Sequence, residues 1–298
     1  MKKVFLLMAV AGVTTFAVLP YSADAQDEDV RGAFMTTRPK ANERPARRPA
    51  RAVRRRPKTT IPPPNAGSPG SSETKKSNTT EPVKPRVREQ KLGIGLTLYM
   101  RDSNGLSLRV DPSREFRQND RVRLLLETNA DGFLYVFNTT DDGAPVMIYP
   151  DPELDEGGNY IQAHVPVEVP SGVAAEERLR WFRFDAQPGT ERLYFVFTRE
   201  PLAGIPLEDE LIGFCKDGGA KCPLRPAAEL WAEVQKNSTA PAQTAKSKEF
   251  GTAQTTNEQE ATTRGIGLNK DDPEPSLVMM TASSSANILV ATLELLHK

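Results

Sequence analysis

Apolar and polar side chains alternate along much of residues 92–298, and this period of two predicts a chain built mainly from β-strands. The first strand is expected where every second residue is apolar, at Leu92, Ile94, Leu96, Leu98 and Met100. A turn signal at Ser103–Gly105 separates it from the next strand. The same reasoning predicts further strands over residues 106–110, 122–126, 132–137, 145–149, 165–169, 179–184 and 193–197.

Two of these strands are apolar on both faces. In residues 132–137, Phe133, Tyr135 and Phe137 point to one side, while Leu134 and Val136 point to the other. Residues 193–197 read LYFVF and show the same pattern. Such strands need cover on both faces, so we expect central positions in a sheet that is also covered by helices. The hairpin over residues 132–150 is accordingly predicted to lie in the interior of the domain.

Two short helices are predicted next, from Pro206 and from Pro226, because proline is favoured at the first helical position. Residues 237–261 are polar or small, with Phe250 as the only large apolar residue, and we expect them to form a disordered insertion. Residues 276–282 and 287–297 alternate again and must pack on the earlier sheet, since a lone pair of strands is unstable in water. The predicted fold class is mostly β: a β-sandwich-like domain of at least seven strands with two short helices over residues 91–298.

The beginning of the chain has a different composition. Residues 1–25 have two lysines, an apolar run and a small-x-small triplet, Ala23-Asp24-Ala25, which together predict a signal peptide cleaved before Gln26. The alternative is an uncleaved anchor. Residues 26–90 are rich in proline and arginine and poor in large apolar residues, so they are predicted to be a disordered arm. The protein is therefore expected to be exported, to the periplasm or outside the cell.

The net charge of the chain changes from positive to negative at the end of this arm. Residues 26–91 contain 17 Lys and Arg against 7 Asp and Glu, whereas residues 92–298 contain 20 against 31. A basic cluster of this kind binds polyanions, and an anionic envelope surface is favoured over nucleic acid because of the predicted export. The alternatives are a solvated spacer and an arm that folds back onto its own acidic domain. The candidate polyanion-binding residues are Arg47, Arg48, Arg51, Arg54, Arg55 and Arg56.

The chain contains two cysteines, Cys215 and Cys222. In an exported protein a close pair predicts a disulfide, and two free thiols are the alternative. Zinc is not expected, because His164 and His297 stand at no metal-ligand spacing from other residues.

Catalytic motifs are missing from the sequence: it has no G-x-S-x-G elbow, no phosphate-binding loop and no H-E-x-x-H. The weak metal candidates are Asp151, Glu153 and Asp155, which alternate as in a calcium loop, although Gln162 stands where such a loop needs its last glutamate. A merely solvated acidic loop is the alternative. No cofactor is predicted.

Three further residues have a functional and a structural interpretation. His164 has the chemistry of a general base, but a lone histidine without a matched nucleophile is interpreted as part of a structural hydrogen-bond network. Trp181 and Trp231 are interpreted as packing residues rather than as a platform for a ligand.

Several segments together resemble one bacterial family. They are GIGLTLYMRD at residue 93, the run from VDPSREF to VMIYP at 110–150, LRWFRFDAQPGTERLYFVFTREPL at 179 and ILVATLELLHK at 288. They resemble the domain of unknown function 4384 over about residues 91–225 and 262–298. The resemblance implies a mostly β bacterial module, often attached to envelope or signalling parts. It implies no activity and no catalytic residues.

The function expected from these features is a non-enzymatic binding or scaffold module of the bacterial cell envelope, exported and carrying a basic flexible tether. Its partner, an envelope component or a protein, is not identified by the sequence. The alternative is a calcium-dependent carbohydrate binder or a hydrolase that uses the acidic loops at residues 141–156.

Overall fold

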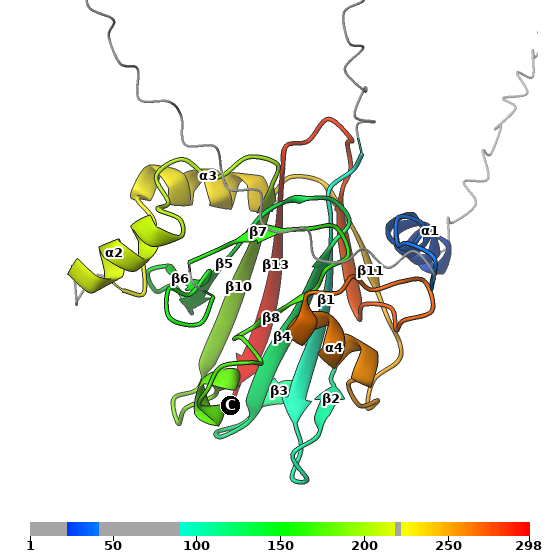
Figure 1. The fold of residues 1–298 in the computed structure, drawn as a ribbon, viewed down its shortest axis with the longest axis horizontal. Coiled ribbons are helices and arrows are strands. Elements are labelled where there is room, and N and C mark those ends of the chain that lie inside the picture. The colour runs from blue at the N-terminus through cyan, green and yellow to red at the C-terminus, as the bar shows by residue number, and fades with distance from the viewer. Residues whose placement is uncertain (1–22, 42–89, 156, 218–221) are drawn as a thin grey trace, which may run out of the picture.

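The computed structural model describes residues 23–41, 90–155, 157–217 and 222–298. Within these residues 13 strands form two sheets that pack face to face, with helices on the outer faces (Figure 1). This arrangement confirms the predicted mostly β, sandwich-like fold.

One sheet, sheet A, has the strand order β11-β12-β1-β4-β8, with β2 paired to β1 and β9 paired to β4. Each of these pairings is antiparallel. The bounds of its strands are β1 Gly93–Arg101, β2 Ser107–Arg109, β4 Arg121–Thr128, β8 Val167–Val169, β9 Phe182–Arg183, β11 Ala242–Lys246 and β12 Leu277–Thr281.

The other sheet, sheet B, has the order β3-β13-β10-β5-β6, with β7 paired to β5. Only β3 and β13 run parallel; the other pairs are antiparallel. The bounds of its strands are β3 Glu115–Phe116, β5 Gly132–Thr140, β6 Val146–Tyr149, β7 Tyr160–Ile161, β10 Gly189–Thr198 and β13 Ile288–His297. The predicted terminal strands therefore belong to both sheets, β12 to sheet A and β13 to sheet B.

The main core lies between the two sheets, where alternate residues of each strand meet. Leu98 and Leu124 of sheet A and Val136 and Phe195 of sheet B belong to it, and each is at most 1% exposed. Burial of an aliphatic side chain of this kind stabilises a fold by about 1.5–3 kcal/mol. The period of two in the sequence is thus the signature of this interface.

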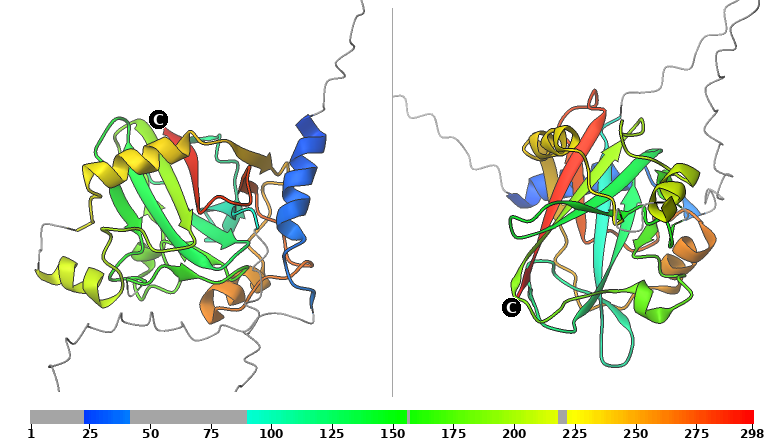
Figure 2. Two further views of the ribbon diagram at one scale, coloured as in Figure 1. Left: turned by 90° about the horizontal axis from the view of Figure 1, so that it is seen from above. Right: turned by 90° about the vertical axis from the view of Figure 1, so that its left-hand side faces the viewer.

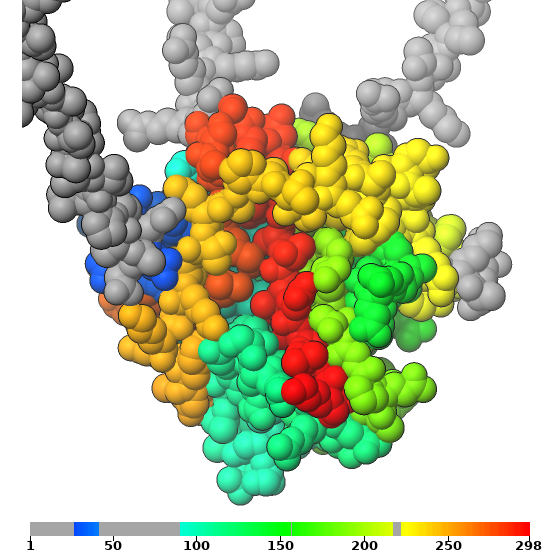
Figure 3. Space-filling view, turned by 180° about the vertical axis from the view of Figure 1, so that it is seen from behind, coloured from blue at the N-terminus to red at the C-terminus, as the bar shows by residue number. Residues whose placement is uncertain are grey.

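Two helices, α2 (Asp209–Asp217) and α3 (Ala228–Ser238), cover part of the outer face of sheet B (Figure 2). Leu211 of α2 and Val234 of α3 pack there with Tyr135 and Phe137 of β5 and Val196 of β10. This second cluster explains why β5 and β10 are apolar on both faces. Seen from behind, α3 lies across one end of this face, and part of β13 remains at the surface (Figure 3).

The hairpin over residues 132–150 was predicted to lie in the interior of the domain, and this holds for only one of its two strands. Its first strand, β5, is central, but its second strand, β6, is the edge of sheet B. The edge is not bare, because the backbone N–H of Met147 donates to the carbonyl of Leu224 at 2.8 Å.

The expectation of a disordered arm is wrong for its first part. Residues 23–35 form a helix, α1 (Ala23–Met35), which packs beside β11 and β12 on the outer face of sheet A. Val30 and Phe34, four residues apart, face Ala245 and Val278. Two apolar residues on one helix face are too sparse a pattern to stand out in the sequence. Their burial depends on a sheet surface that the sequence does not display.

The expectation of a disordered insertion at residues 237–261 is also wrong. This stretch contains the end of α3, strand β11 and most of a fourth helix, α4 (Thr256–Arg264). Strand β11 is held through its backbone ladder to β12, which needs no apolar alternation. Helix α4 begins with a capping box between Thr255 and Glu258 and ends at Gly265 with φ 61°. It was missed because its buried face has almost no apolar residues.

The strand expected at residues 179–184 is mostly replaced by other structure. A single 3-10 turn, η2 (Glu177–Arg180), precedes the two-residue strand β9. Most of the predicted signal peptide and of the basic arm lies outside the described residues, as do all six candidate polyanion-binding arginines. Within the described part of the chain, no helix is long and apolar enough to cross a bilayer.

Candidate functional site

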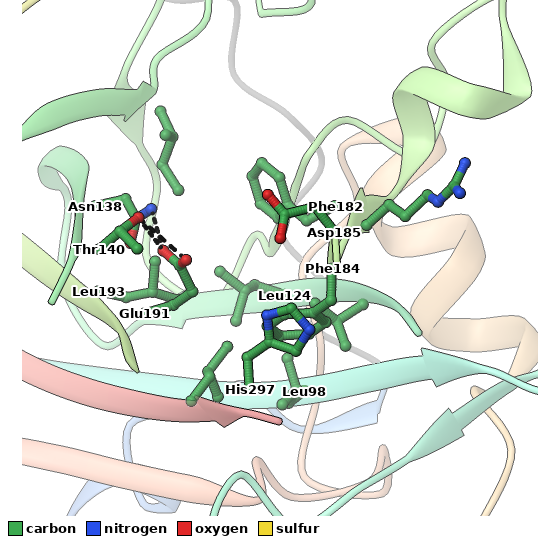
Figure 4. Close-up of a pocket in the computed structure, with 14 residues that line it drawn as sticks. Leu98, Leu124, Asn138, Thr140, Phe182, Phe184, Asp185, Glu191, Leu193 and His297 are labelled. Atoms are coloured by element: carbon green, nitrogen blue, oxygen red, sulfur yellow. Dashed lines mark hydrogen bonds between the residues drawn. The ribbon is translucent and has the colours of Figure 1, made fainter. Parts of the chain in front are cut away.

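A cavity of about 260 Å³ opens between the two sheets at the end where β13 finishes (Figure 4). Leu98 and Leu124 of sheet A and Leu193 and Leu295 of sheet B line its apolar part. The segment that carries Phe182, Phe184 and Asp185 stands opposite Asn138 and Glu191 (Figure 4). The cavity is therefore an extension of the sandwich core that reaches the surface.

Inward-facing positions on sheet B change from apolar to polar at this end. Asn138, Glu191 and His297, one from each of β5, β10 and β13, are among the polar residues that line the cavity. Each stands two positions from a buried apolar residue of the same strand, namely Val136, Leu193 and Leu295. A polar residue in an inward register is visible in the sequence as a break in alternation. None of the three is predicted as a site residue from the sequence, because the period of two does not show which strands lie side by side.

Glu191 is held in place by its neighbours on β5. The amide nitrogen Nδ2 of Asn138 donates to Oε2 of Glu191 at 2.7 Å, and the hydroxyl of Thr140 donates to the same carboxylate at 2.9 Å. Among the described residues no lysine, arginine or histidine forms an ion pair with Glu191. The carboxylate is thus held in a fixed orientation at the cavity and is not paired there with a cation of the described residues.

Asn138 adds a second acceptor. Its Oδ1 is buried and has no hydrogen-bond partner among the residues that the structure describes. The orientation of the amide is determined, because only the NH₂ group can donate to the carboxylate of Glu191. A buried carbonyl without a donor costs about 1–3 kcal/mol.

The opposite wall is aromatic. Phe184 stacks on Phe116 with ring centroids 4.9 Å apart, and its ring centroid lies 5.1 Å from that of His297. Arg183 in this wall donates to the side-chain carbonyl of Asn119. The cavity thus combines an apolar interior with acceptors on one rim, an arrangement that suits an apolar group carrying a hydrogen-bond donor or a positive charge.

A second cleft of about 640 Å³ lies next to this cavity and shares Ile148 and Phe182 with it. The predicted metal candidates, Asp151, Glu153 and Asp155, line this cleft. They do not converge as ligands. Oδ1 of Asp151 accepts from the backbone N–H of Glu153 at 2.7 Å, and Oδ2 of Asp155 accepts from the N–H of Asp151 at 2.9 Å. No group of three or more acidic, histidine or cysteine side chains in the described part of the chain has the geometry of a metal site.

Asp155 is nevertheless perturbed. Burial raises its pKa to about 7, with the charge of Asp151 adding to the rise and the hydrogen bond from the backbone of Asp151 opposing it. A carboxyl whose pKa lies near neutral pH, and which is therefore partly protonated there, is a feature of this cleft that the sequence did not reveal.

The other residues singled out in the sequence have structural surroundings. His164 is 2% exposed and hydrogen-bonded to Glu127 and Thr37. Trp231 makes an edge contact with Tyr194, with ring centroids 4.7 Å apart. Trp181 lines the second cleft, and the guanidinium of Arg123 lies 4.5 Å from the centroid of its ring.

The predicted disulfide is confirmed. Cys215 of α2 is bonded to Cys222, with the two Cα atoms 5.5 Å apart. The bond ties the end of α2 to the segment that leads to Leu224, and so to the edge of sheet B.

One family model matches the chain, that of the domain of unknown function DUF4384, over residues 115–201. The match extends from β3 to the segment after β10. It includes Asn138, Glu191 and the wall around Phe184, but not β1 or β13. No curated protein and no solved structure shows a significant match.

Proposed function

We propose that this chain, whose residues 115–201 belong to the DUF4384 family, is an exported, non-enzymatic binding module of the bacterial cell envelope. It binds an apolar group with a positively charged or N–H-donating end in the cavity between the sheets. The observation that carries the proposal is Glu191, held by Asn138 and Thr140 beside an apolar cavity and without a cationic partner among the described residues.

The size of the cavity narrows the class of ligand. At about 260 Å³ it is smaller than the usual 300–1,000 Å³ of sites for drug-sized ligands. It fits a group the size of one long side chain, such as an aliphatic ammonium or guanidinium. A lysine or arginine of a partner protein has this chemistry: an aliphatic stem for Leu193 and Leu295, and donors for Glu191.

The test uses n-pentylguanidinium as probe, with n-pentanol as its uncharged counterpart. We expect the guanidinium to shift the NMR signals of cavity residues and to bind at least tenfold more tightly than the alcohol. Glu191→Gln should remove this preference, because hydrogen bonds to a charged partner contribute about 1.5–3 kcal/mol. The matched control is Glu294→Gln on the exposed face of β13, where Glu294 pairs with Arg192 at 2.7 Å. Equal binding of both probes, or shifts outside the cavity, would contradict the proposal.

Export is supported by two features. The sequence of residues 1–25 has the parts of a signal peptide, and the disulfide between Cys215 and Cys222 is of a kind that persists in oxidising compartments. In the native cell we expect a chain that begins at Gln26 and has no free thiol. Intact mass after alkylation under denaturing, non-reducing conditions checks both points. A full-length mass in the membrane fraction, or two alkylated cysteines, would count against export.

The basic arm is proposed to tether the module to an anionic surface. The observation is the charge separation along the chain, together with six arginines between residues 47 and 56. Basic residues near an anionic membrane gain up to about 1 kcal/mol each, and screening limits this attraction to about 8 Å at physiological ionic strength. Sedimentation with anionic vesicles at low salt should bring down the native chain. It should not bring down a variant in which Arg47, Arg48, Arg51, Arg54, Arg55 and Arg56 are all glutamine. If both sediment alike, or neither does, the arm is a spacer or folds onto its own domain.

A further inference from the structure

The second cleft lies along one open side of the sandwich, between the edges of the two sheets. Part of its lining comes from β6, the edge strand of sheet B. Another part comes from Pro170, which follows β8, and from Phe182 of β9, both at the edge of sheet A. Ile148 and Phe182, which are half-buried, line both this cleft and the cavity at Glu191. The cavity and the second cleft therefore adjoin at these two side chains.

The wall of the second cleft on the side of sheet A is apolar. Leu179 of η2, Trp181 and Phe182 follow one another along it. The indole of Trp181 is held in place, because the guanidinium of Arg123, a residue only 8% exposed, lies 4.5 Å from its ring centroid. Arg123 in turn donates from Nη2 to Oε1 of Gln254 at 3.1 Å. An apolar group that binds here meets a surface that is already ordered, so little conformational entropy is lost on binding.

The opposite wall of the second cleft belongs to the side of sheet B. Leu211 of α2, Leu224 and the two bonded cysteines, Cys215 and Cys222, line it. The disulfide joins the end of α2 to the segment that covers the edge of β6. This covalent link braces the second wall, so the cleft has two walls that are held without a ligand.

The carboxylates that line the second cleft are hydrogen-bonded to its own backbone. Asp151 accepts from the backbone N–H groups of Glu153 and Leu154 at 2.7 and 3.1 Å, and Asp155 accepts from that of Asp151 at 2.9 Å. Burial also raises the pKa of Asp155 to about 7, so this carboxyl is partly neutral near neutral pH. The second cleft thus offers a ligand mainly its apolar wall, whereas the cavity offers the carboxylate of Glu191.

Two adjoining sites of different chemistry fit two side chains of one polypeptide. The cavity, at about 260 Å³, has room for one long side chain, and the second cleft, at about 640 Å³, has room for a bulkier one. Side chains at positions i and i+2 of an extended peptide stand on the same side, about 6.4–6.8 Å apart. A peptide backbone can stay outside while its side chains enter two adjoining sites, which a single alkyl chain cannot do. The charge of Glu191 determines which of the two side chains is basic.

We propose that the cavity and the second cleft are two subsites of one groove, which binds a partner protein through a short segment with a basic and a large apolar side chain. The basic side chain lies at Glu191. The apolar side chain lies against Leu179 and Trp181, with Ile148 and Phe182 between the two subsites. This inference rests on the proposed function, because it takes the cation site at Glu191 as given and adds the apolar side chain as a second determinant of specificity.

The test uses an acetylated, amidated peptide of seven residues, with arginine at its centre and alanine elsewhere. Six derivatives each replace one alanine by leucine, so the spacing and the order of the two side chains are sampled together. Binding to the native chain is measured by NMR titration. We expect at least one derivative to bind at least about tenfold more tightly than the parent peptide, because its leucine buries apolar surface in the second cleft.

Variants of the protein locate this gain. The measured quantity is the ratio of the affinities for the best leucine peptide and for the parent peptide. Trp181→Ala and Leu179→Gln should each bring this ratio close to one. Leu179→Gln keeps the test decisive if Trp181→Ala fails to fold, because none of the residues of η2 is buried. The matched control is Leu106→Ala, which should keep the native ratio. Leu106 is 52% exposed and is not among the described residues that line the cavity or the second cleft.

The possible results separate this inference from the proposed function. If the parent peptide binds and Glu191→Gln weakens it, but no leucine adds affinity, the cavity is the whole site and the inference is wrong. A ratio that stays high in both Trp181→Ala and Leu179→Gln would place the leucine elsewhere and overturn it as well. If the parent peptide does not bind, or Glu191→Gln has no effect on it, the proposed function itself fails.

A long alkyl amine is the other occupant that the apolar wall could accept. It is tested with n-dodecylguanidinium against n-pentylguanidinium. Tighter binding of the longer probe that is lost in Leu179→Gln, together with no gain from any leucine, would assign the second cleft to an alkyl amine and overturn the peptide groove. A leucine gain that depends on Leu179 and Trp181 supports the groove.

Discussion

Arg38 and Glu127, 89 residues apart in the sequence, form a bidentate ion pair that is almost wholly excluded from solvent. Nε of Arg38 donates to Oε1 at 2.9 Å and Nη2 donates to Oε2 at 2.7 Å. Its remaining N–H groups donate to the carbonyls of Asn269, Asp272 and Pro273. All five donors of the guanidinium are thus satisfied by groups of the domain.

The first prediction concerns this pair. Arg38→Gln leaves the carboxylate of Glu127 buried beside His164 without its main cation, and removal of one partner of a buried ion pair costs about 3–5 kcal/mol. Urea unfolding should show this loss. The control is Arg192→Gln, which breaks the exposed pair with Glu294 and should cost at most about 1 kcal/mol. Equal losses in the two variants would mean that the N-terminal segment is not docked in solution.

The second prediction uses two glycines on either side of the same interface. A Cβ at Gly95 of β1 would lie 2.5 Å from Cγ of Pro275 and 3.1 Å from Cζ of Phe34, so Gly95→Ala should destabilise the protein by about 1–3 kcal/mol. A Cβ at Gly32 of α1 would meet no atom of the described residues within 4 Å. Gly32→Ala should therefore stabilise the docked helix by about 0.5–1 kcal/mol. Thermal melts of both variants check the opposite signs, and a stabilising Gly95→Ala would show that α1 and Pro275 do not pack there.

These interfaces show where sequence reasoning succeeds and where it stops. Strands such as β1 and β10 could be predicted because each alternate residue is buried against the facing sheet, and that burial is recorded locally as a period of two. Helix α4 was missed because its main buried side chain is Glu258. The polarity of Glu258 is compensated by Arg109 and by the hydroxyl of Tyr99, whose oxygen lies 2.8 Å from Oε1.

Contacts with residues far along the chain also explain why the first part of the predicted arm is packed on the domain instead of being disordered. Arg38 has the same local sequence character as the arginines that follow it, and only Glu127, far along the chain, distinguishes it. The cavity could be predicted in part from the sequence. The inward register of Asn138 and Glu191 could be read from the alternation of β5 and β10, but the hydrogen bond between them depends on the pairing of these strands.

The third prediction compares the two faces of the last strand. Leu289 of β13 is 2% exposed in the core between the sheets, whereas Leu296 is 40% exposed. Leu289→Ala should cost about 2–5 kcal/mol, the usual range for a buried leucine. Leu296→Ala should stay within about 1 kcal/mol of the native chain, as most surface substitutions do. Chemical unfolding of both variants measures the difference, and similar values would mean that β13 is in another register.

The fourth prediction concerns the pH dependence that Asp155 adds to stability. Burial, with the charge of Asp151, raises its pKa from 3.8 to about 7 in the folded protein. The folded state therefore holds this proton more tightly than the unfolded state. The contribution of Asp155 is most favourable below about pH 4, declines as the pH rises from about 4 to about 7, and is constant above that. Asp155→Asn removes the titration, so the variant should gain stability relative to the native chain across this interval, by at most about 1.4 kcal/mol per pH unit.

The measurement is the free energy of urea unfolding of the native chain and of Asp155→Asn at pH 4.5, 6 and 8. The comparison between the two isolates Asp155 from other carboxyls, such as Glu127, whose lowered pKa acts in the opposite direction and equally in both chains. Asp185→Asn is the matched control, because Asp185 is exposed and its Oδ1 accepts from the N–H of Gln187 at 2.7 Å, a bond that asparagine can keep. Its stability should follow the native chain at each pH. If Asp155→Asn also follows the native chain, burial does not raise the pKa of Asp155 in the folded protein, and this carboxyl is ionised near neutral pH.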